Sequence, residues 1–109
     1  MAAPSDVRVV LVTAPDAATA EVLARALVEE RLAACVNVVP GVRSIYRWQG
    51  RVEEADEVLL LVKTRADRGA ALAARVRELH PYELPEVLEL PALGGSEAYL
   101  GWVREESAP

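Results

Sequence analysis

The chain has 109 residues, of which 52% are hydrophobic and 27% are charged, and this size predicts one compact domain over residues 1–109. Its formal net charge of −5 argues against nucleic acid as a partner, because a grip on phosphate backbones needs clustered lysine and arginine. Residues 1–6 lack the basic opening of a targeting segment, apolar runs such as Val58–Val62 are too short to span a bilayer, and the single cysteine fits a reducing compartment, so we expect a cytoplasmic protein with no membrane partner.

The first elements in chain order are a short strand and an amphipathic helix. Val7–Val12 is a β-branched apolar run that predicts a strand, and Pro15-Asp16 then predicts the start of a helix. Apolar residues recur at helical spacing to a predicted end near Leu32; they are Ala20, Leu23, Ala24, Leu27 and Val28.

A long hairpin is predicted next. Cys35–Trp48 is rich in β-formers, Gln49-Gly50 provides a turn, and a second arm runs over Arg51–Thr64. Pro40-Gly41 interrupts the first arm and predicts a bulge or bend, since proline cannot donate to a strand ladder. The tip is polar and exposed, which favours a neighbouring subunit that covers the hairpin.

The last third of the chain predicts a helix, a strand and a terminal helix. Thr64 is a candidate helix cap, and His80-Pro81 ends that helix. Glu86–Leu90 predicts a strand, and Ser96 a cap for a short final helix. The full order is βαββαβ plus a C-terminal helix, which indicates an α+β ferredoxin-like fold with an antiparallel sheet and its helices on one face.

Several separated motifs are more specific than turn or packing rules require. They are Arg31–Pro40, Ser44–Gly50, Lys63-Thr64, His80–Glu86 and Tyr99–Trp102. In this order and at these distances they resemble the CutA divalent-cation tolerance family over nearly the whole chain. The resemblance implies a cytoplasmic homotrimer, similar to PII-type signalling trimers, that takes part in tolerance of copper and other divalent metal ions. We expect no organic cofactor.

The resemblance also implies candidate metal ligands. The site proposed for some members uses a cysteine before the Thr-Ala-Pro turn and two histidines before Pro-Tyr, and this chain has Val12 and Leu79 at two of those positions. His80 remains, and its imidazole suits Cu(II), or it simply ends a helix. Cys35 is either a soft ligand or a small buried hydrophobe. Glu83 is a candidate oxygen ligand, with Glu86 and Glu89 nearby.

A second group of residues is predicted to line a cleft between subunits. The aromatic members are Tyr46, Trp48, Tyr82 and Trp102, whose alternative role is interface packing. Glu57 is the carboxylate of the hairpin singled out for this cleft, and Lys63 could complete an anion pocket there. The other acidic residues of the hairpin are expected to be solvated or paired across subunits.

Catalysis is not expected, because one histidine, one cysteine and scattered serines form no recognisable nucleophile and base. Two functions remain. The first is a trimer that binds divalent cations, copper foremost. The alternative is a PII-like regulatory or scaffolding trimer that binds a small anionic ligand or a partner protein in the clefts between its subunits.

Overall fold

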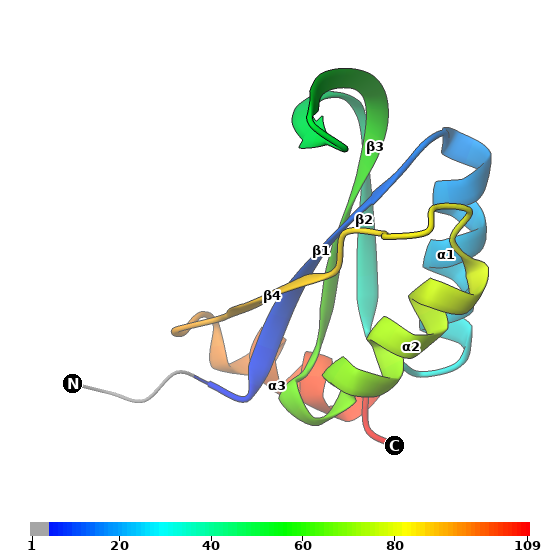
Figure 1. Ribbon diagram of the computed structural model, residues 1–109. Helices are drawn as coiled ribbons and strands as arrows, with labels where there is room; N and C mark the ends of the chain where they lie inside the picture. Colours follow the sequence, from blue (N-terminus) through cyan, green and yellow to red (C-terminus); the bar gives the residue numbers. More distant parts are fainter. Residues whose placement is uncertain (1–4) are drawn as a thin grey trace.

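The computed structural model describes residues 5–109, and the order of its elements is the predicted one (Figure 1). Of the segment 1–6 examined for targeting signals, residues 1–4 lie outside the described part. The elements are β1 (Val7–Ala14), α1 (Ala17–Glu29), β2 (Cys35–Trp48), β3 (Arg51–Arg65), the 3-10 turn η1 (Ala66–Arg68), α2 (Gly69–Leu79), β4 (Leu88–Pro91) and α3 (Glu97–Glu106).

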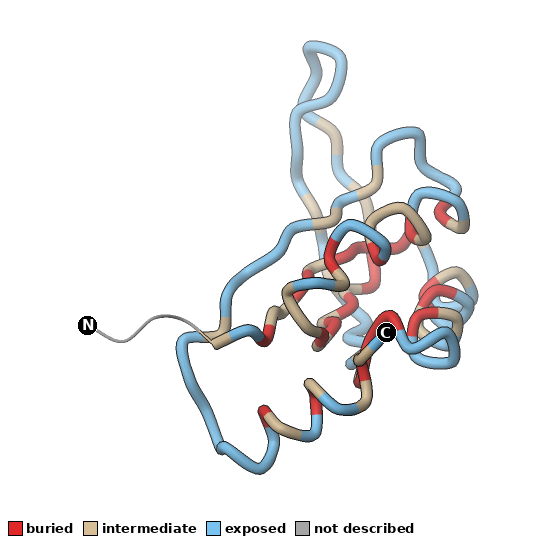
Figure 2. The backbone as a smooth tube through the Cα atoms, turned by 90° about the horizontal axis from the view of Figure 1, so that it is seen from below, coloured by how far each residue is buried: buried red, intermediate tan, exposed pale blue. Residues whose placement is uncertain are grey.

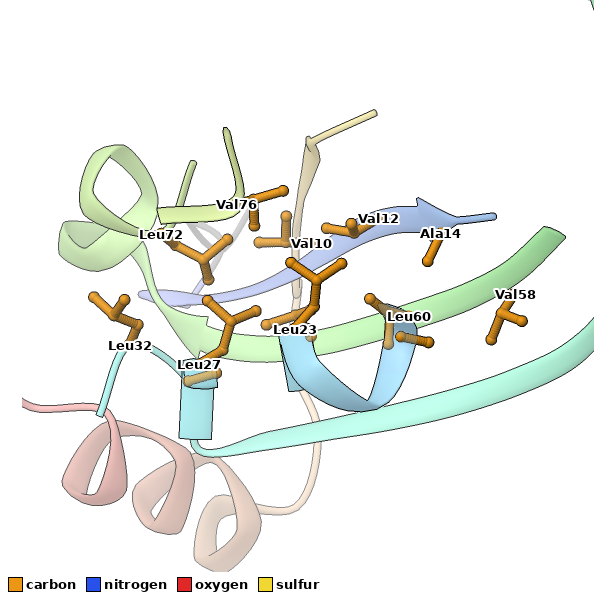
Figure 3. Packing of buried hydrophobic residues seen from close by; sticks show 13 residues of the cluster. Val10, Val12, Ala14, Leu23, Leu27, Leu32, Val58, Leu60, Leu72 and Val76 are labelled. Atoms are coloured by element: carbon orange, nitrogen blue, oxygen red, sulfur yellow. The ribbon is translucent and has the colours of Figure 1, made fainter. Parts of the chain in front are cut away.

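The four strands form one antiparallel sheet in the order β2-β3-β1-β4, so the α+β ferredoxin-like prediction is confirmed. Val10 lies opposite Val62 and Val12 opposite Leu60, and all four side chains are fully buried. α1 and α2 cover this face and contribute the other core residues, chiefly Leu23, Leu27, Leu72 and Val76 (Figure 3). Each such side chain contributes roughly 1.5–3 kcal/mol by leaving water.

The opposite face of the sheet is only partly covered. Side chains alternate along a strand, so Val7 points away from Val10 and Val12, and there it meets Leu100 and Val103 of α3. Leu88 and Leu90 of β4 lie beyond this contact and are 54% and 42% exposed. We call the uncovered apolar part of this face, defined by Leu59, Leu61, Leu88 and Leu90, the open face.

The hairpin of β2 and β3 extends beyond the rest of the molecule and curls over at its tip (Figures 1 and 2). The pairing shifts by one residue between Val39 and Val42, and Gly41 takes φ 78°, so the predicted bulge at Pro40-Gly41 is confirmed. Gln49 and Gly50 both have positive φ, as a tight hairpin turn requires. A bulge increases the local twist, which accounts for the curl.

Three predicted boundaries are wrong. α1 ends at Glu29 rather than near Leu32, because Arg31 takes φ 60° and the amides of Leu32 and Ala33 both donate to the Leu27 carbonyl at 2.9 and 3.0 Å. Thr64 caps no helix, since it stays in β3 and its Oγ1 donates to the Leu32 carbonyl at 2.7 Å. β4 begins at Leu88 instead of Glu86.

Side chains cap the N-terminal ends of α1 and α3. Asp16 accepts a hydrogen bond from the Thr19 amide at 2.7 Å, and Ser96 caps α3 by accepting from the Tyr99 amide, as predicted. No helix among residues 5–109 combines the length and the apolar character that crossing a membrane requires.

Candidate functional site

A cleft of about 790 Å³ lies between the curled hairpin and the loop that follows α2. It opens on the side of the sheet opposite to α1 and α2, because Tyr46 and Trp48 pair with Glu53 and Arg51 and therefore share the face of Glu57. The lining residues are Thr13, Arg43, Ser44, Ile45, Tyr46, Trp48, Glu57, Pro81, Tyr82, Glu83, Leu84 and Glu86.

His80 fixes the loop that forms one wall of this cleft. It follows the last residue of α2, is 7% exposed, and its Nε2 lies 2.7 Å from the Thr13 carbonyl oxygen. Its Nδ1 accepts from the Tyr82 amide at 3.0 Å, so Nδ1 carries no proton and Nε2 donates to Thr13. Both nitrogens of a neutral imidazole are thereby occupied within the chain, and a metal ion would have to displace one of these bonds.

Tyr82 connects the loop to β3. Its ring lies 4.7 Å from the His80 ring, and its hydroxyl donates to Oε2 of Glu57 at 3.2 Å. Burial raises the pKa of Tyr82, and the nearby charge of Glu57 raises it further. Glu57 is only 8% exposed, and the Tyr82 hydroxyl thus holds its carboxylate in place.

The cleft carries negative charge. Burial raises the pKa of Glu86, and the charge of Glu57 adds to this effect, so these two carboxyl groups lie near enough to influence one another. Glu83 also lines the cleft. Arg43 is the one cationic residue of the lining described, and its Nη2 is paired with Oε2 of Glu54 at 2.6 Å. A cation entering the cleft would reduce the repulsion between Glu57 and Glu86.

The structure brings part of the predicted cleft together. Tyr46, Trp48, Glu57 and Tyr82 line one cavity, joined by Glu83. Lys63 and Trp102 lie elsewhere: Lys63 pairs with Val9 and Cys35 at the other end of β3, and Trp102 packs beside Tyr99 on α3, with ring centroids 5.7 Å apart. That the cleft is shared between subunits stays a prediction.

The three candidate metal ligands do not meet. His80 is bonded at the level of Thr13, which pairs with Leu59, whereas Cys35 pairs with Lys63 four positions along the same strand, about 13 Å away. Cys35 is a half-buried free thiol, and Tyr99 lies beside it, with a pKa raised by burial first and by Cys35 second. Within residues 5–109 there is no group of three or more His, Cys, Asp or Glu side chains placed to hold a metal ion.

Six lining residues were not predicted: Thr13, Arg43, Ser44, Ile45, Pro81 and Leu84. Thr13 contributes its carbonyl oxygen to His80 and its side chain to the cleft, and Arg43 contributes to the hairpin wall. The Thr-Ala-Pro segment at the end of β1 was the available signal for Thr13. Arg43 has no comparable signal, because its position depends on how far the bulge bends the hairpin.

Comparisons with known proteins agree with this architecture. The sequence model of the CutA1 divalent ion tolerance protein family matches residues 8–106. The divalent-cation tolerance protein CutA of Thermus thermophilus is 56% identical over 99 residues, which are 91% of this chain and 96% of that protein. Human protein CutA is 48% identical over 102 residues, 94% of this chain but only 57% of the human protein.

Solved structures agree as well. A Thermus thermophilus structure described as a divalent cation tolerance protein (Cut A1) has a TM-score of 0.92 and 54% identity, with 94% of this chain and 99% of that chain covered. The structure of the CutA protein from Archaeoglobus fulgidus, named periplasmic, has a TM-score of 0.89 and 35% identity, with 93% and 98% covered. The match over almost the whole length places this chain in the CutA1 divalent ion tolerance protein family.

Proposed function

We propose that this protein contributes to metal tolerance by binding divalent cations, copper foremost, in the cleft between the hairpin and the His80–Glu86 loop, and that it acts as a cytoplasmic homotrimer. The observation that carries the cation site is the pair Glu57 and Glu86, which line one cleft, where burial first and the charge of Glu57 second raise the pKa of Glu86. A bound divalent ion would reduce the repulsion between these two carboxylates. We propose a binding role with no catalytic step.

The ligands follow from the position of each candidate. Glu57 and Glu86 offer carboxylate oxygens, and among divalent first-row metals Cu(II) binds most nitrogen and oxygen sites best. His80 joins them as a ligand only if the bond to Thr13 or the bond to Tyr82 opens, so its main role here is to orient Tyr82. Cys35 would form a separate, weaker soft site. We therefore expect modest affinity.

The open face supports the proposed trimer. Its residues Leu88 and Leu90, together with Trp102 of α3, expose 54%, 42% and 42% of their surface, which is a large apolar area for a chain to leave in water. The cleft opens on this same side, so subunits that meet through the open face would bring their hairpins close to neighbouring clefts. Closed symmetric assembly is the usual outcome for such a surface.

Calorimetric titration of Cu(II) and Zn(II) into the purified protein, in a non-chelating buffer at neutral pH, tests the cation site. Glu57→Gln and Glu86→Gln should each weaken binding roughly ten-fold or more, about 1.4 kcal/mol. Asp56→Asn is the matched control, because Asp56 is the exposed neighbour of Glu57 and alternates to the other side of β3. Binding that survives both glutamine variants but disappears in Cys35→Ser would move the site to the thiol.

The alternative function, a regulatory trimer that binds a small anionic ligand, fits this cleft less well. Among the described lining residues Arg43 is the one cation and is already paired, and Lys63 lies outside the cleft.

The cytoplasmic location is a proposal based on the single cysteine. Relatives are named chloroplastic in Arabidopsis thaliana and periplasmic in Archaeoglobus fulgidus, so location varies within the family.

A further inference from the structure

Three aromatic side chains of the cleft are left partly open to solvent. Tyr46 and Trp48 come from β2 and Tyr82 from the opposite wall, and they are 43%, 39% and 38% exposed. Tyr46 lies near enough to Tyr82 to influence its pKa, so the two walls approach one another across the cavity. The electron-rich faces of such rings attract cations.

Glu57 provides a buried negative charge next to these rings. The Tyr82 hydroxyl donates to Oε2 of this carboxylate, and this is the one side-chain hydrogen bond that Glu57 makes within residues 5–109. A carboxylate with so little exposed surface is stabilised by a partner of positive charge. Arg43 does not serve as that partner, because it is paired with Glu54.

We propose that the cleft binds an organic cation, an alkylammonium or quaternary ammonium group, which rests against Trp48, Tyr46 and Tyr82 with Glu57 as its counter-charge. Such a group is weakly hydrated and makes no coordinate bonds, so it uses ring faces that a metal ion does not need. The volume of about 790 Å³ suits a small molecule with an apolar tail along Ile45 and Leu84. This inference does not depend on metal binding.

The experiment uses Trp48 as its own reporter. The chain has two tryptophans, so Trp102→Phe leaves Trp48 as the sole indole, and tetramethylammonium chloride is titrated while its fluorescence is recorded. Sodium chloride at equal ionic strength is the control titration. We expect a saturable change with tetramethylammonium only, which Glu57→Gln weakens roughly ten-fold and Asp56→Asn leaves unchanged.

A second variant keeps the test decisive if Glu57→Gln does not fold. Trp48→Leu removes an exposed ring from the hairpin, and saturation-transfer NMR of tetramethylammonium then replaces fluorescence as the readout. Loss of the NMR signal in Trp48→Leu but not in Trp102→Phe supports the proposal. A fluorescence change that does not saturate, or an affinity that neither Glu57→Gln nor Trp48→Leu alters, overturns it.

The same variants separate this inference from the proposed metal function. Trp48→Leu should abolish tetramethylammonium binding and leave Cu(II) calorimetry unchanged, because the indole is not a metal ligand. Absence of Cu(II) binding together with intact tetramethylammonium binding would overturn the metal function alone. Cu(II) binding without tetramethylammonium binding would overturn the organic-cation site alone.

Discussion

At the scale of single residues, His80 holds together two segments that are 67 positions apart in the sequence. It donates to Thr13 at the end of β1 and accepts from Tyr82 in the loop, and Tyr82 in turn reaches Glu57 on β3. In this series of hydrogen bonds, each side chain positions the next one. A histidine of this kind acts on the cleft without needing to touch a ligand.

Replacement of His80 by Ala should therefore lower the free energy of unfolding by about 2 kcal/mol, because the buried Thr13 carbonyl loses its donor. Urea unfolding at a fixed protein concentration measures the change. Arg77→Ala, an exposed position in the same turn of α2, should change it by less than about 0.5 kcal/mol. An unchanged stability combined with loss of Cu(II) binding would instead identify His80 as a ligand.

Glu86 should make cation binding dependent on pH. Its pKa is raised in the folded chain, so between the ordinary pKa and the raised pKa the folded state holds a proton that the unfolded state releases, and stability falls as pH rises through this interval. Glu86→Gln should raise the urea midpoint at pH 7, and the gain should vanish as pH falls from the raised pKa to the ordinary one. Cu(II) affinity of the unmodified chain should increase as pH rises through the same range. A midpoint difference independent of pH would contradict this.

At the scale of elements, the bulge in the hairpin depends on a backbone conformation that glycine adopts most easily. Gly41 has φ 78° with no atom near the place of a Cβ, so Gly41→Ala should cost about 1–2 kcal/mol through the backbone alone. Gly94 also has free space around it but no positive φ, and Gly94→Ala should therefore be neutral or slightly stabilising. Equal effects of the two substitutions in urea unfolding would show that alanine adopts this conformation as easily as glycine.

The accuracy of the sequence predictions followed the range of the interactions involved. The bulge at Pro40-Gly41 and the turn at Gln49-Gly50 depend on neighbouring residues and were predictable. Thr64 was taken for a cap because its local pattern allows it, but β3 continues to Arg65, which pairs with Val7 from the other end of the chain. Long-range pairing of this kind overrides a local capping signal.

The candidate site was predictable only in part for the same reason. Tyr46, Trp48, Glu57 and Tyr82 were predicted to share a cleft between subunits, and within the single chain they line one cavity, because their motifs lie on the hairpin arms and the loop that face one another. That a second subunit completes this cavity stays a prediction. Lys63 lies outside this cavity because β3 is 15 residues long, and residues on one strand therefore serve opposite ends of the molecule. The partners of His80 are the carbonyl of Thr13 and the amide of Tyr82, and because every residue has such backbone groups, the sequence does not predict these bonds.

At the scale of the whole molecule, the open face should govern assembly. Leu90→Asp would place a charge on that face at the edge strand β4, where it would be buried without a partner in a trimer, and should shift the protein toward monomers. Size-exclusion chromatography with light scattering measures the mass. Val22→Asp on the outer side of α1, 56% exposed, is the matched control and should leave the mass unchanged. A unimodal trimer in both variants would place the interface elsewhere.

The single extra residue in β2 between Val39 and Val42 carries a further consequence. Without that residue, the arms of the hairpin could pair regularly along their whole length, and Tyr46 would still lie opposite Glu53. Only the added twist of the bulge would be lost. Deletion of one codon at Gly41 would thus leave the arm with only the ordinary twist of a hairpin and move its aromatic rings away from Tyr82, with almost no change in amino-acid composition. The capacity of the cleft to enclose a ligand therefore depends on chain length at one point as much as on the side chains that line it.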